Sequence, residues 1–358
     1  MYPEFVSATT RGPRSGTKYD VAILGTTPAA LYLALTLVEG GVPNVALCQT
    51  RDYPLDLGVL WPSLTEHWGM LADTIGKPQT EGLIRAIARS RDLILREPEA
   101  RKGAVMQLAS NATEMQEMTH NLRWLSDLWP RRLMSAGSAS NYLTVNEVAG
   151  AAFVGDCCCF DVENLTRRLF IRLQTKGLKV LPEPTQDAEI VVNADPKGPG
   201  LFHQCGAEFL CAGMAEPWNP ALVGIETQRG HLLIHPNVGG GWWISGVAPE
   251  GAGPEGPPWR VDPKLVGILS NLAGQALSEL EGLITSQARP LIYQCSADGL
   301  PLVGPRPGNP RQWTVGGFAG RSWSLGPALG EQVGRAILGQ STPLLDALPC
   351  LRPARWLR

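Results

Sequence analysis

The sequence predicts an α/β fold in which a Rossmann-like βαβ domain is joined to a second domain. A short β-branched strand, 19–24 (YDVAIL), runs through a glycine turn into an apolar helix, 29–38 (AALYLALTLV), and a second strand follows at 44–48 (NVALC). This unit of about 30 residues has the size of a nucleotide-binding βαβ motif. The chain has 358 residues, and at about 150 residues per domain it predicts about two domains.

The composition is that of a globular protein with a large core, since 44% of the residues are hydrophobic and 18% are charged. The formal net charge of -2 gives no electrostatic reason to expect a nucleic acid or an anionic membrane surface as partner. No apolar run approaches the roughly 20 residues of a membrane-spanning helix, and 1–18 contain no apolar signal region. We therefore expect a cytoplasmic protein with neither kind of partner.

The cysteine and histidine residues predict no metal site. The sequence holds 8 cysteines, three of them consecutive at 157–159, and no CxxC pair. His231 and His235 are separated by strand-like residues, where a spacing of four does not form a chelating face. We expect reduced thiols that pack as small apolar residues.

The turn after the first strand carries an altered dinucleotide-binding motif. Gly25 keeps the first glycine, Thr27 replaces the second, and Ala30 is a small residue in place of the third. The Cβ of Thr27 is expected to crowd a pyrophosphate, and Gln49 stands where an acidic residue would bind a ribose. Taken alone, this motif favours equally a cofactor site and a βαβ unit that binds no nucleotide.

Three motifs near the C-terminus carry a family resemblance. They are 298–305 (DGLPLVGP), 313–320 (WTVGGFAG) and 325–330 (LGPALG). In this order they resemble the C-terminal signature of the D-amino-acid oxidase family of flavoproteins, which includes glycine oxidase and sarcosine oxidase. In that family such a turn precedes a strand, a glycine-rich loop and a helix directed at the flavin.

Four earlier segments agree with the same resemblance. The segment 161–165 (DVENL) is similar to the start of a family helix, and 207–213 (AEFLCAG) is similar to the strand that returns to the nucleotide. The segment 227–231 (TQRGH) is similar to another family strand, and Arg289, before Pro290, falls where the family has its substrate-carboxylate arginine. The resemblance covers about residues 19–340.

The resemblance implies a discontinuous two-domain architecture. An FAD-binding domain is expected from 1–75, 150–215 and 285–358. A substrate or cap domain with a mixed sheet is expected from 76–149 and 216–284.

FAD is the cofactor that the resemblance implies. Its expected contacts are small residues, backbone N–H groups and polar side chains, for which the alternatives are tight turns and ordinary loops. The predicted cofactor-binding residues are Gly25, Thr26, Thr27, Ala30, Gln49, Arg51, Gly58, Ala212, Gly213, Gly317, Gly320 and Ser322.

Arg289 is the main candidate for substrate binding, because a planar guanidinium holds a carboxylate through two parallel hydrogen bonds. The alternative is a salt bridge with Asp or Glu at a domain interface. Arg321, Trp61 and Tyr293 are expected to line the pocket, with a solvated arginine and core aromatic residues as alternatives. We predict no catalytic side chain, because hydride transfer to a flavin needs chiefly orientation and desolvation.

The predicted function is FAD-dependent oxidation of a C–N bond in an amine or amino acid, with hydride transfer to flavin N5. The acceptor of the electrons is O₂ or a protein partner. The chain between Gly230 and Gly246 is shorter than in the family, and no Tyr lies between Tyr142 and Tyr293. A shorter segment would leave the pocket more open. Such a pocket would suit a bulky or carrier-bound amine, or a site that a partner subunit completes. The alternatives are a cofactor-poor accessory subunit and the FAD subunit of a multi-subunit amine dehydrogenase.

Overall fold

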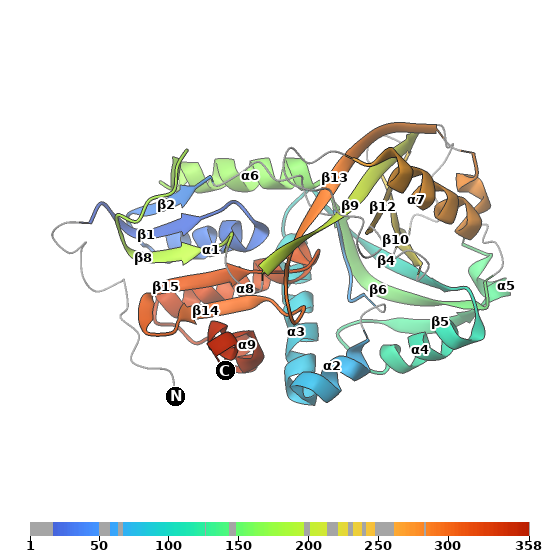
Figure 1. Cartoon of the computed structure of the whole chain (residues 1–358), viewed down its shortest axis with the longest axis horizontal. Coiled ribbons are helices and arrows are strands. Elements are labelled where there is room, and N and C mark those ends of the chain that lie inside the picture. Colours follow the sequence, from blue (N-terminus) through green and yellow to red (C-terminus); the bar gives the residue numbers. More distant parts are fainter. Residues whose placement is uncertain are drawn as a thin grey trace.

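The computed structural model describes residues 17–49, 58–63, 67–125, 127–142, 148–196, 201–212, 221–227, 232–237, 241–247, 261–282 and 284–357. Two sheets form the molecule, with the longest helices between and around them (Figure 1). This is the predicted α/β architecture, a parallel βαβ sheet joined to a second, mixed sheet. The predicted residues Arg51 and Gly213 lie outside the described residues.

The first sheet contains the βαβ unit. Its strand order is β14-β15-β8-β1-β2-β7. The strands are β1 (Tyr19–Leu24), β2 (Val45–Cys48), β7 (Lys179–Leu181), β8 (Ala188–Asn193), β14 (Leu302–Arg306) and β15 (Asn309–Gly316). β1 is parallel to both β2 and β8, and its six residues are all buried, as expected for a central strand of a parallel sheet.

Helix α1 (Pro28–Glu39) joins β1 to β2 and is buried on nearly every side. Thr27 caps its first turn, Pro28 occupies the first helical position, and Gly40 follows its last residue. α6 (Val162–Thr175) and α8 (Ser322–Ile337) both pack against α1. The predicted strand–helix–strand order over 19–48 is confirmed, with the helix beginning one residue before its predicted start.

The second sheet is mixed. Its order is β13-β9-β12-β11-β10-β4-β6-β3, and β5 pairs with β6. The strands are β3 (Val59–Leu60), β4 (Ala100–Ala109), β5 (Arg131–Ser135), β6 (Gly150–Phe160), β9 (Leu201–Ala212), β10 (Leu222–Thr227), β11 (Leu232–Pro236), β12 (Trp242–Val247) and β13 (Ile284–Ser296). β4 and β10 are parallel, and the other neighbouring strands of this sheet are antiparallel.

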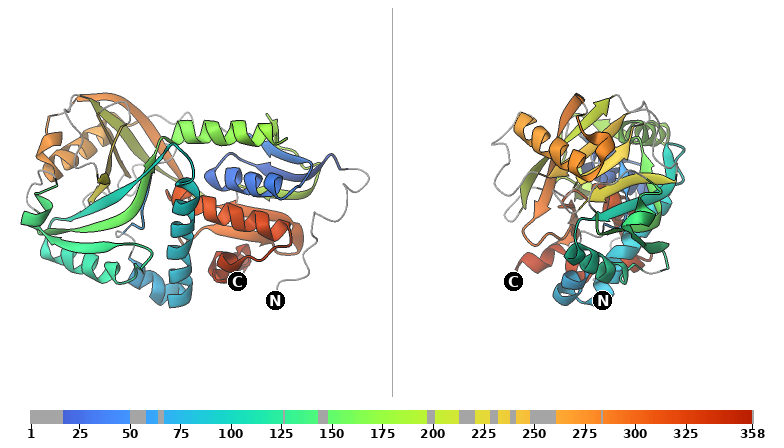
Figure 2. Two further views of the ribbon diagram at one scale, coloured as in Figure 1. Left: turned by 180° about the vertical axis from the view of Figure 1, so that it is seen from behind. Right: turned by 90° about the vertical axis from the view of Figure 1, so that its right-hand side faces the viewer.

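The helices between and beside the sheets join them into one body. They are α2 (Trp68–Ile75), α3 (Lys77–Ile94), α4 (Ala112–Leu122), α5 (Ala136–Ala139), α7 (Pro263–Ala276) and α9 (Pro343–Asp346). α3 stands upright between the two sheets (Figure 2) and packs against α8. No helix in the described part of the chain has the length and apolarity needed to cross a membrane.

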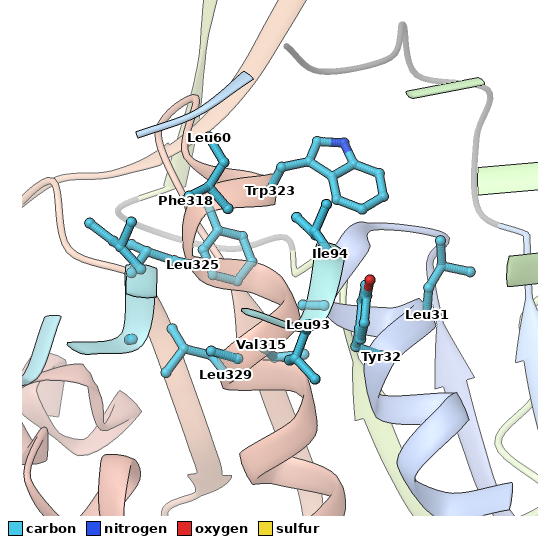
Figure 3. Close-up of a cluster of buried hydrophobic side chains, with 14 of the residues drawn as sticks. Leu31, Tyr32, Leu60, Leu93, Ile94, Val315, Phe318, Trp323, Leu325 and Leu329 are labelled. Atoms are coloured by element: carbon cyan, nitrogen blue, oxygen red, sulfur yellow. The ribbon is translucent and has the colours of Figure 1, made fainter. Parts of the chain in front are cut away.

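A shared hydrophobic cluster lies where α1, α3, α8 and β3 meet (Figure 3). Trp323, in the first turn of α8, packs edge-on against Phe160 with ring centroids 5.1 Å apart. Other members are Leu31, Tyr32, Leu60, Leu93, Ile94, Val315, Phe318, Leu325 and Leu329. Since they come from both sheets and from the helices between them, the two sheets are held by one continuous core.

One strand assignment drawn from the family resemblance is wrong. The segment 207–213 is not the strand that returns to the nucleotide, because β9 pairs with β12 and β13 in the second sheet. The strand that pairs with β1 on the side opposite β2 is β8, and its Asn193 pairs with Leu24. A strand that ends in small residues occurs in both places, and only its partners distinguish them.

The predicted domain boundaries stay a prediction. β6, β9 and most of β13 belong to the second sheet, although the segments 150–215 and 285–358 were expected in the FAD-binding domain. These long strands extend between the two halves of the molecule (Figure 1). The sheet to which a strand belongs therefore does not by itself define the boundary between the two predicted domains.

The DGLP turn is held by a clamp from the C-terminal end of the described chain. Arg355 Nε lies 2.6 Å from Asp298 Oδ2, and Arg355 Nη2 donates to the Leu300 carbonyl at 2.7 Å. Ser296 Oγ and the Leu300 N–H also donate to Asp298 Oδ1, at 2.9 and 3.1 Å. Burial alone would raise the pKa of Asp298, but these hydrogen bonds, led by that from Arg355, lower it far below its usual range.

Asp298→Asn is therefore expected to destabilise the protein by about 1 to 2 kcal/mol at pH 7. A depressed native pKa stabilises the fold above the unfolded value of about 3.9, and this stabilisation is lost as pH falls toward the native pKa. Urea unfolding between pH 7 and pH 2.5 should show the wild type and the variant converging below about pH 4. A stability difference that stays constant over this range would contradict the assigned role.

Candidate functional site

The turn after β1 brings the carboxyl ends of β1 and β8 together. Gly25 has φ +116°, and a Cβ there would lie 3.1 Å from Asp195 Cβ and 3.2 Å from the backbone of Ala194. A side chain at this position would be strained by the backbone conformation and crowded by the neighbouring strand. The positive φ and the close approach of β8 together explain why the motif begins with glycine.

The N-terminus of α1 is partly occupied by its own cap. Thr27 Oγ1 accepts from the Ala30 N–H at 3.3 Å and donates to the Ala194 carbonyl at 3.4 Å. Pro28 has no N–H to offer. Among the described residues, the N–H groups of Thr26 and Ala29 have no hydrogen-bond partner. The altered motif thus keeps backbone donors, but fewer than a turn with three glycines would offer.

Helix α8 runs parallel to α1 in direct contact with it. A Cβ at Gly326 would lie 3.0 Å from the Ala29 nitrogen, and one at Gly334 would lie 2.8 Å from Thr36. The contacts advance along both helices in the same direction, so their N-termini lie at the same end. α8 begins at Ser322, four residues before Gly326, whereas α1 begins at Pro28, one residue before Ala29. The start of α8 therefore lies about 4.5 Å beyond that of α1.

The start of α8 has no side-chain cap. The N–H groups of Ser322, Trp323 and Ser324 have no partner within the described residues. Each helix carries about half a positive charge at its N-terminus, and parallel helices add these charges. Together, the two helix ends make an environment for a negatively charged group.

The loop between β15 and α8 is held in a strained conformation. Gly317 and Gly320 have φ of +73° and +81°, and Ala319 has φ +51° although it carries a Cβ. Gln294, on β13, fixes the loop by accepting from the Gly317 N–H at 3.0 Å and donating to the Pro196 carbonyl at 2.7 Å. The predicted residues Gly317, Gly320 and Ser322 therefore lie together at the start of α8.

The residues at this edge fit the anionic part of a dinucleotide such as FAD. The unpaired N–H groups of α1 and α8 would face negative charge, and the exposed Gln49 after β2 offers a neutral partner to a ribose. The hydroxyl of Thr27 is turned back onto its own helix. Asp195 adds one negative charge beside the turn, with Oδ1 3.3 Å from the Gln294 amide nitrogen.

Two predicted substrate residues, Tyr293 and Arg321, lie at the α8 loop, and a third, Trp61, is bound to a carboxylate of the second sheet. Trp61 donates through Nε1 to Glu226 Oε2 at 3.0 Å. Tyr293 packs under the α8 loop, where its ring lies 3.2 Å from the Cβ position of Gly320. Arg321 precedes α8 and is half-buried. Of the predicted cofactor residues, Ala212 ends β9 opposite Ile284 in the second sheet.

A second group of predicted residues meets at a cavity of about 560 Å³ beside the second sheet. Gly58 and Arg289 both line it, and a Cβ at Gly58 would lie 2.3 Å from the Phe160 carbonyl oxygen. The other described lining residues are Glu99, Arg101, Cys159, Phe160, Asp161, Val162, Glu163, His235, Pro236, Asn237, Trp243 and Gln287. The volume is many times that of a glycine molecule.

One face of the second sheet carries buried polar groups that the sequence analysis did not identify. The opposite face packs on α7 through apolar side chains. On the polar face, Glu226 accepts from Ser63 Oγ at 2.6 Å and from Gln107 Nε2 at 2.9 Å. Glu208 and His235 lie on the same face, both buried. A single Glu within an apolar strand was the sequence signal that could have identified these groups. Burying a carboxylate without a partner costs free energy, so such a residue indicates a paired or functional group.

The consecutive cysteines do not form a nucleophilic site. Burial raises the pKa of the Cys157 thiol to about 12 and also raises that of Cys159, which lines the cavity. A thiol with a raised pKa is protonated at neutral pH and is a poor nucleophile. Among the described residues, no group of three His, Cys, Asp or Glu side chains is placed to hold a metal ion.

Several solved structures share this fold over nearly their whole length. L-proline dehydrogenase from P. horikoshii is 16% identical with a TM-score of 0.77, and the match covers 96% of this chain and 98% of that one. Glycine oxidase from Geobacillus kaustophilus is 18% identical with a TM-score of 0.72, covering 91% and 96%. L-alpha-glycerophosphate oxidase from Mycoplasma pneumoniae, described with FAD bound, is 12% identical with a TM-score of 0.69, covering 90% and 95%.

These similarities confirm the sequence resemblance at the level of the fold. At 12% to 18% identity they carry the architecture and leave activity and ligands to be argued from the residues. No protein-family model matches the chain.

Proposed function

We propose that this protein is an FAD-dependent oxidoreductase that oxidises a C–N bond of an amine or amino acid. The observation that carries the proposal is the meeting of two parallel helix N-termini, α1 and α8, at the carboxyl end of β1. They lie within a fold shared with a proline dehydrogenase and a glycine oxidase over more than 90% of this chain. We propose the cofactor and the substrate class from these two observations, the helix N-termini and the shared fold.

The residues that would hold FAD are those with unpaired backbone donors. The N–H groups of Thr26 and Ala29 would bind the pyrophosphate, and Gln49 would bind the adenosine ribose. The first turn of α8 would stabilise negative charge on the flavin. When bound, FAD would accept the hydride, which carries both electrons, from the substrate carbon.

The contribution of the chain to such a reaction would be binding, orientation and exclusion of water. The α8 loop is fixed by Gln294, and Trp323 seals its inner side against Phe160. A rigid site of this kind lowers the entropic barrier of bringing reactants together. The cavity lined by Gly58 and Arg289 is the proposed place for the substrate, with a small-molecule or carrier-bound amine as occupant.

The visible absorption spectrum of the purified protein tests the proposal. We expect bands at the usual flavin positions, and free FAD in the supernatant after the protein is denatured by heat. Reduction of these bands by an amine or amino acid without oxygen, followed by comparison of O₂ with artificial acceptors, would separate an oxidase from a dehydrogenase subunit. A colourless protein that does not take up added FAD would contradict the proposal.

One observation favours a second candidate, an accessory subunit that binds a partner chain without cofactor. The cap of Thr27 on Ala30 and the missing N–H of Pro28 remove two donors from the start of α1. Titration of the apoprotein with FAD, followed by flavin fluorescence, distinguishes the two. Saturable binding supports the oxidoreductase, whereas absence of binding supports the accessory subunit.

A further inference from the structure

Arg289 is bound by a buried carboxylate. Its Nε and Nη2 both contact Glu208 Oε2 across the β9–β13 pair. The side chain of Glu208 is 0% exposed, whereas that of Arg289 is 29% exposed. The guanidinium also lies over the ring of Trp243, with 4.7 Å between its Cζ and the ring centroid. The arginine is therefore fixed and its positive charge is compensated from within the sheet.

His235 lies on the other side of the same carboxylate. Its Nε2 is 3.5 Å from Glu208 Oε1. Arg289 and His235 are the two groups at this wall of the cavity that would suit a substrate carboxylate. Glu208 lies between them and contacts both. An anionic ligand at Arg289 would meet a guanidinium whose positive charge Glu208 already compensates, so the attraction between the ligand and Arg289 is weakened.

The remaining charges around the cavity do not supply a compensating positive field. Of the three acidic residues in its described lining, Glu99 and Glu163 are paired with Arg168 and Arg167. Asp161 then stands against the two lining arginines, Arg101 and Arg289. Arg101 is exposed at the start of β4. With Glu208 behind Arg289, the formal charge of this wall does not attract a free carboxylate.

We infer that the cavity accepts an amine whose carboxyl group is absent or blocked, as in a simple amine, an amino amide or a peptide-linked amine, and that Glu208 sets this preference. The inference rests on the proposed function and narrows its substrate class. The cavity volume of about 560 Å³ leaves room for such bulkier molecules. Glu208 does not contact the substrate in this role and acts by neutralising and positioning Arg289.

Three aromatic ligands of similar size test the inference by binding alone. Benzoate, benzamide and benzylamine are titrated into the purified protein by calorimetry. We expect benzamide and benzylamine to bind at least about tenfold more tightly than benzoate, since benzoate would lose its hydration without an uncompensated positive charge to replace it.

Glu208→Gln supplies the converse result. The amide oxygen still accepts from Arg289, but the negative charge is gone, so benzoate affinity is expected to rise about tenfold. Glu163→Gln is the matched control, because Glu163 lines the same cavity but is exposed and paired with Arg167 at 2.8 Å. This control is expected to leave benzoate affinity nearly unchanged.

Benzoate binding to the wild type as tightly as benzamide overturns the inference, as does an absence of binding by all three ligands. An unchanged benzoate affinity in folded Glu208→Gln also overturns it. If that variant does not fold, the ranking of the three ligands on the wild type decides. The calorimetric ranking does not depend on flavin chemistry, so a colourless protein would contradict the proposed function while leaving this test readable.

Discussion

Gly330→Ala is expected to destabilise the protein by about 3 kcal/mol. A Cβ at this position would lie 2.1 Å from the Ala29 carbonyl oxygen and 2.9 Å from the Ala29 carbonyl carbon. Both are backbone atoms in the buried first turn of α1, so neither can rotate away as a flexible side chain would. The added methyl group can be accommodated only by moving α8 away from α1, which opens the packing along both helices.

Chemical denaturation of the variant measures this effect. The same displacement should weaken the proposed FAD binding, because the starts of α1 and α8 would no longer lie together. Gly267→Ala is the control, since Gly267 is in α7 and a Cβ there meets nothing within 4 Å. The control should be neutral or stabilising by up to about 1 kcal/mol. Equal stability of Gly330→Ala and the wild type would show that the helix contact is not rigid.

Arg89→Ala is expected to destabilise the protein by about 3 kcal/mol, because it leaves a buried carboxylate without its main partner. Arg89 Nε donates to Glu331 Oε2 at 2.8 Å, and the Glu331 side chain is 11% exposed. The pair joins α3 to α8, beside the bond from the Ala328 N–H to Ser90 Oγ at 3.1 Å. Its loss therefore acts on the helix that stands between the two sheets.

The double variant Arg89→Met with Glu331→Leu tests the cause. Removing both charges should restore most of the lost stability, since an apolar pair of similar size avoids the desolvation cost. Arg167→Ala is the control, because its partner Glu163 is 2.8 Å away but both side chains are more than 60% exposed. We expect less than about 0.5 kcal/mol there. An Arg89→Ala effect as small as that of the control would contradict the assigned role.

Much of the first sheet could be predicted from local sequence. The apolar strand and helix over 19–38 are both buried and contiguous, so their pattern alone indicates a central βαβ unit. The start of α6 at 161–165 was expected from the family resemblance, and the local sequence supports it, because Asp161 accepts from the Asn164 N–H at 3.0 Å as a helix cap. Capping and apolar runs are local properties, which is why these elements were found.

The partners of strands could not be predicted in the same way. The segment 207–213 looks like a strand ending in small residues, but its pairing with β12 and β13 depends on residues far along the chain. Likewise, a salt bridge of Arg289 was an open alternative, yet its partner Glu208 is 81 residues away. Such pairings are set by topology, and one sequence without its fold does not specify them.

The direct contact between α1 and α8 has a consequence for how this site tolerates sequence change. The spacing of the two helix starts is set by glycine against backbone, at Gly326 and Gly330, and not by interlocking side chains. These glycine contacts fix the distance between the two helices independently of the turn between β1 and α1. Substitutions in that turn, such as those at Thr27 and Pro28, can therefore remove single donors while the two positive ends stay aligned. The ability to bind an anion would decline with each donor that the turn loses, whereas a single methyl group at Gly330 would disrupt the alignment of the two helices.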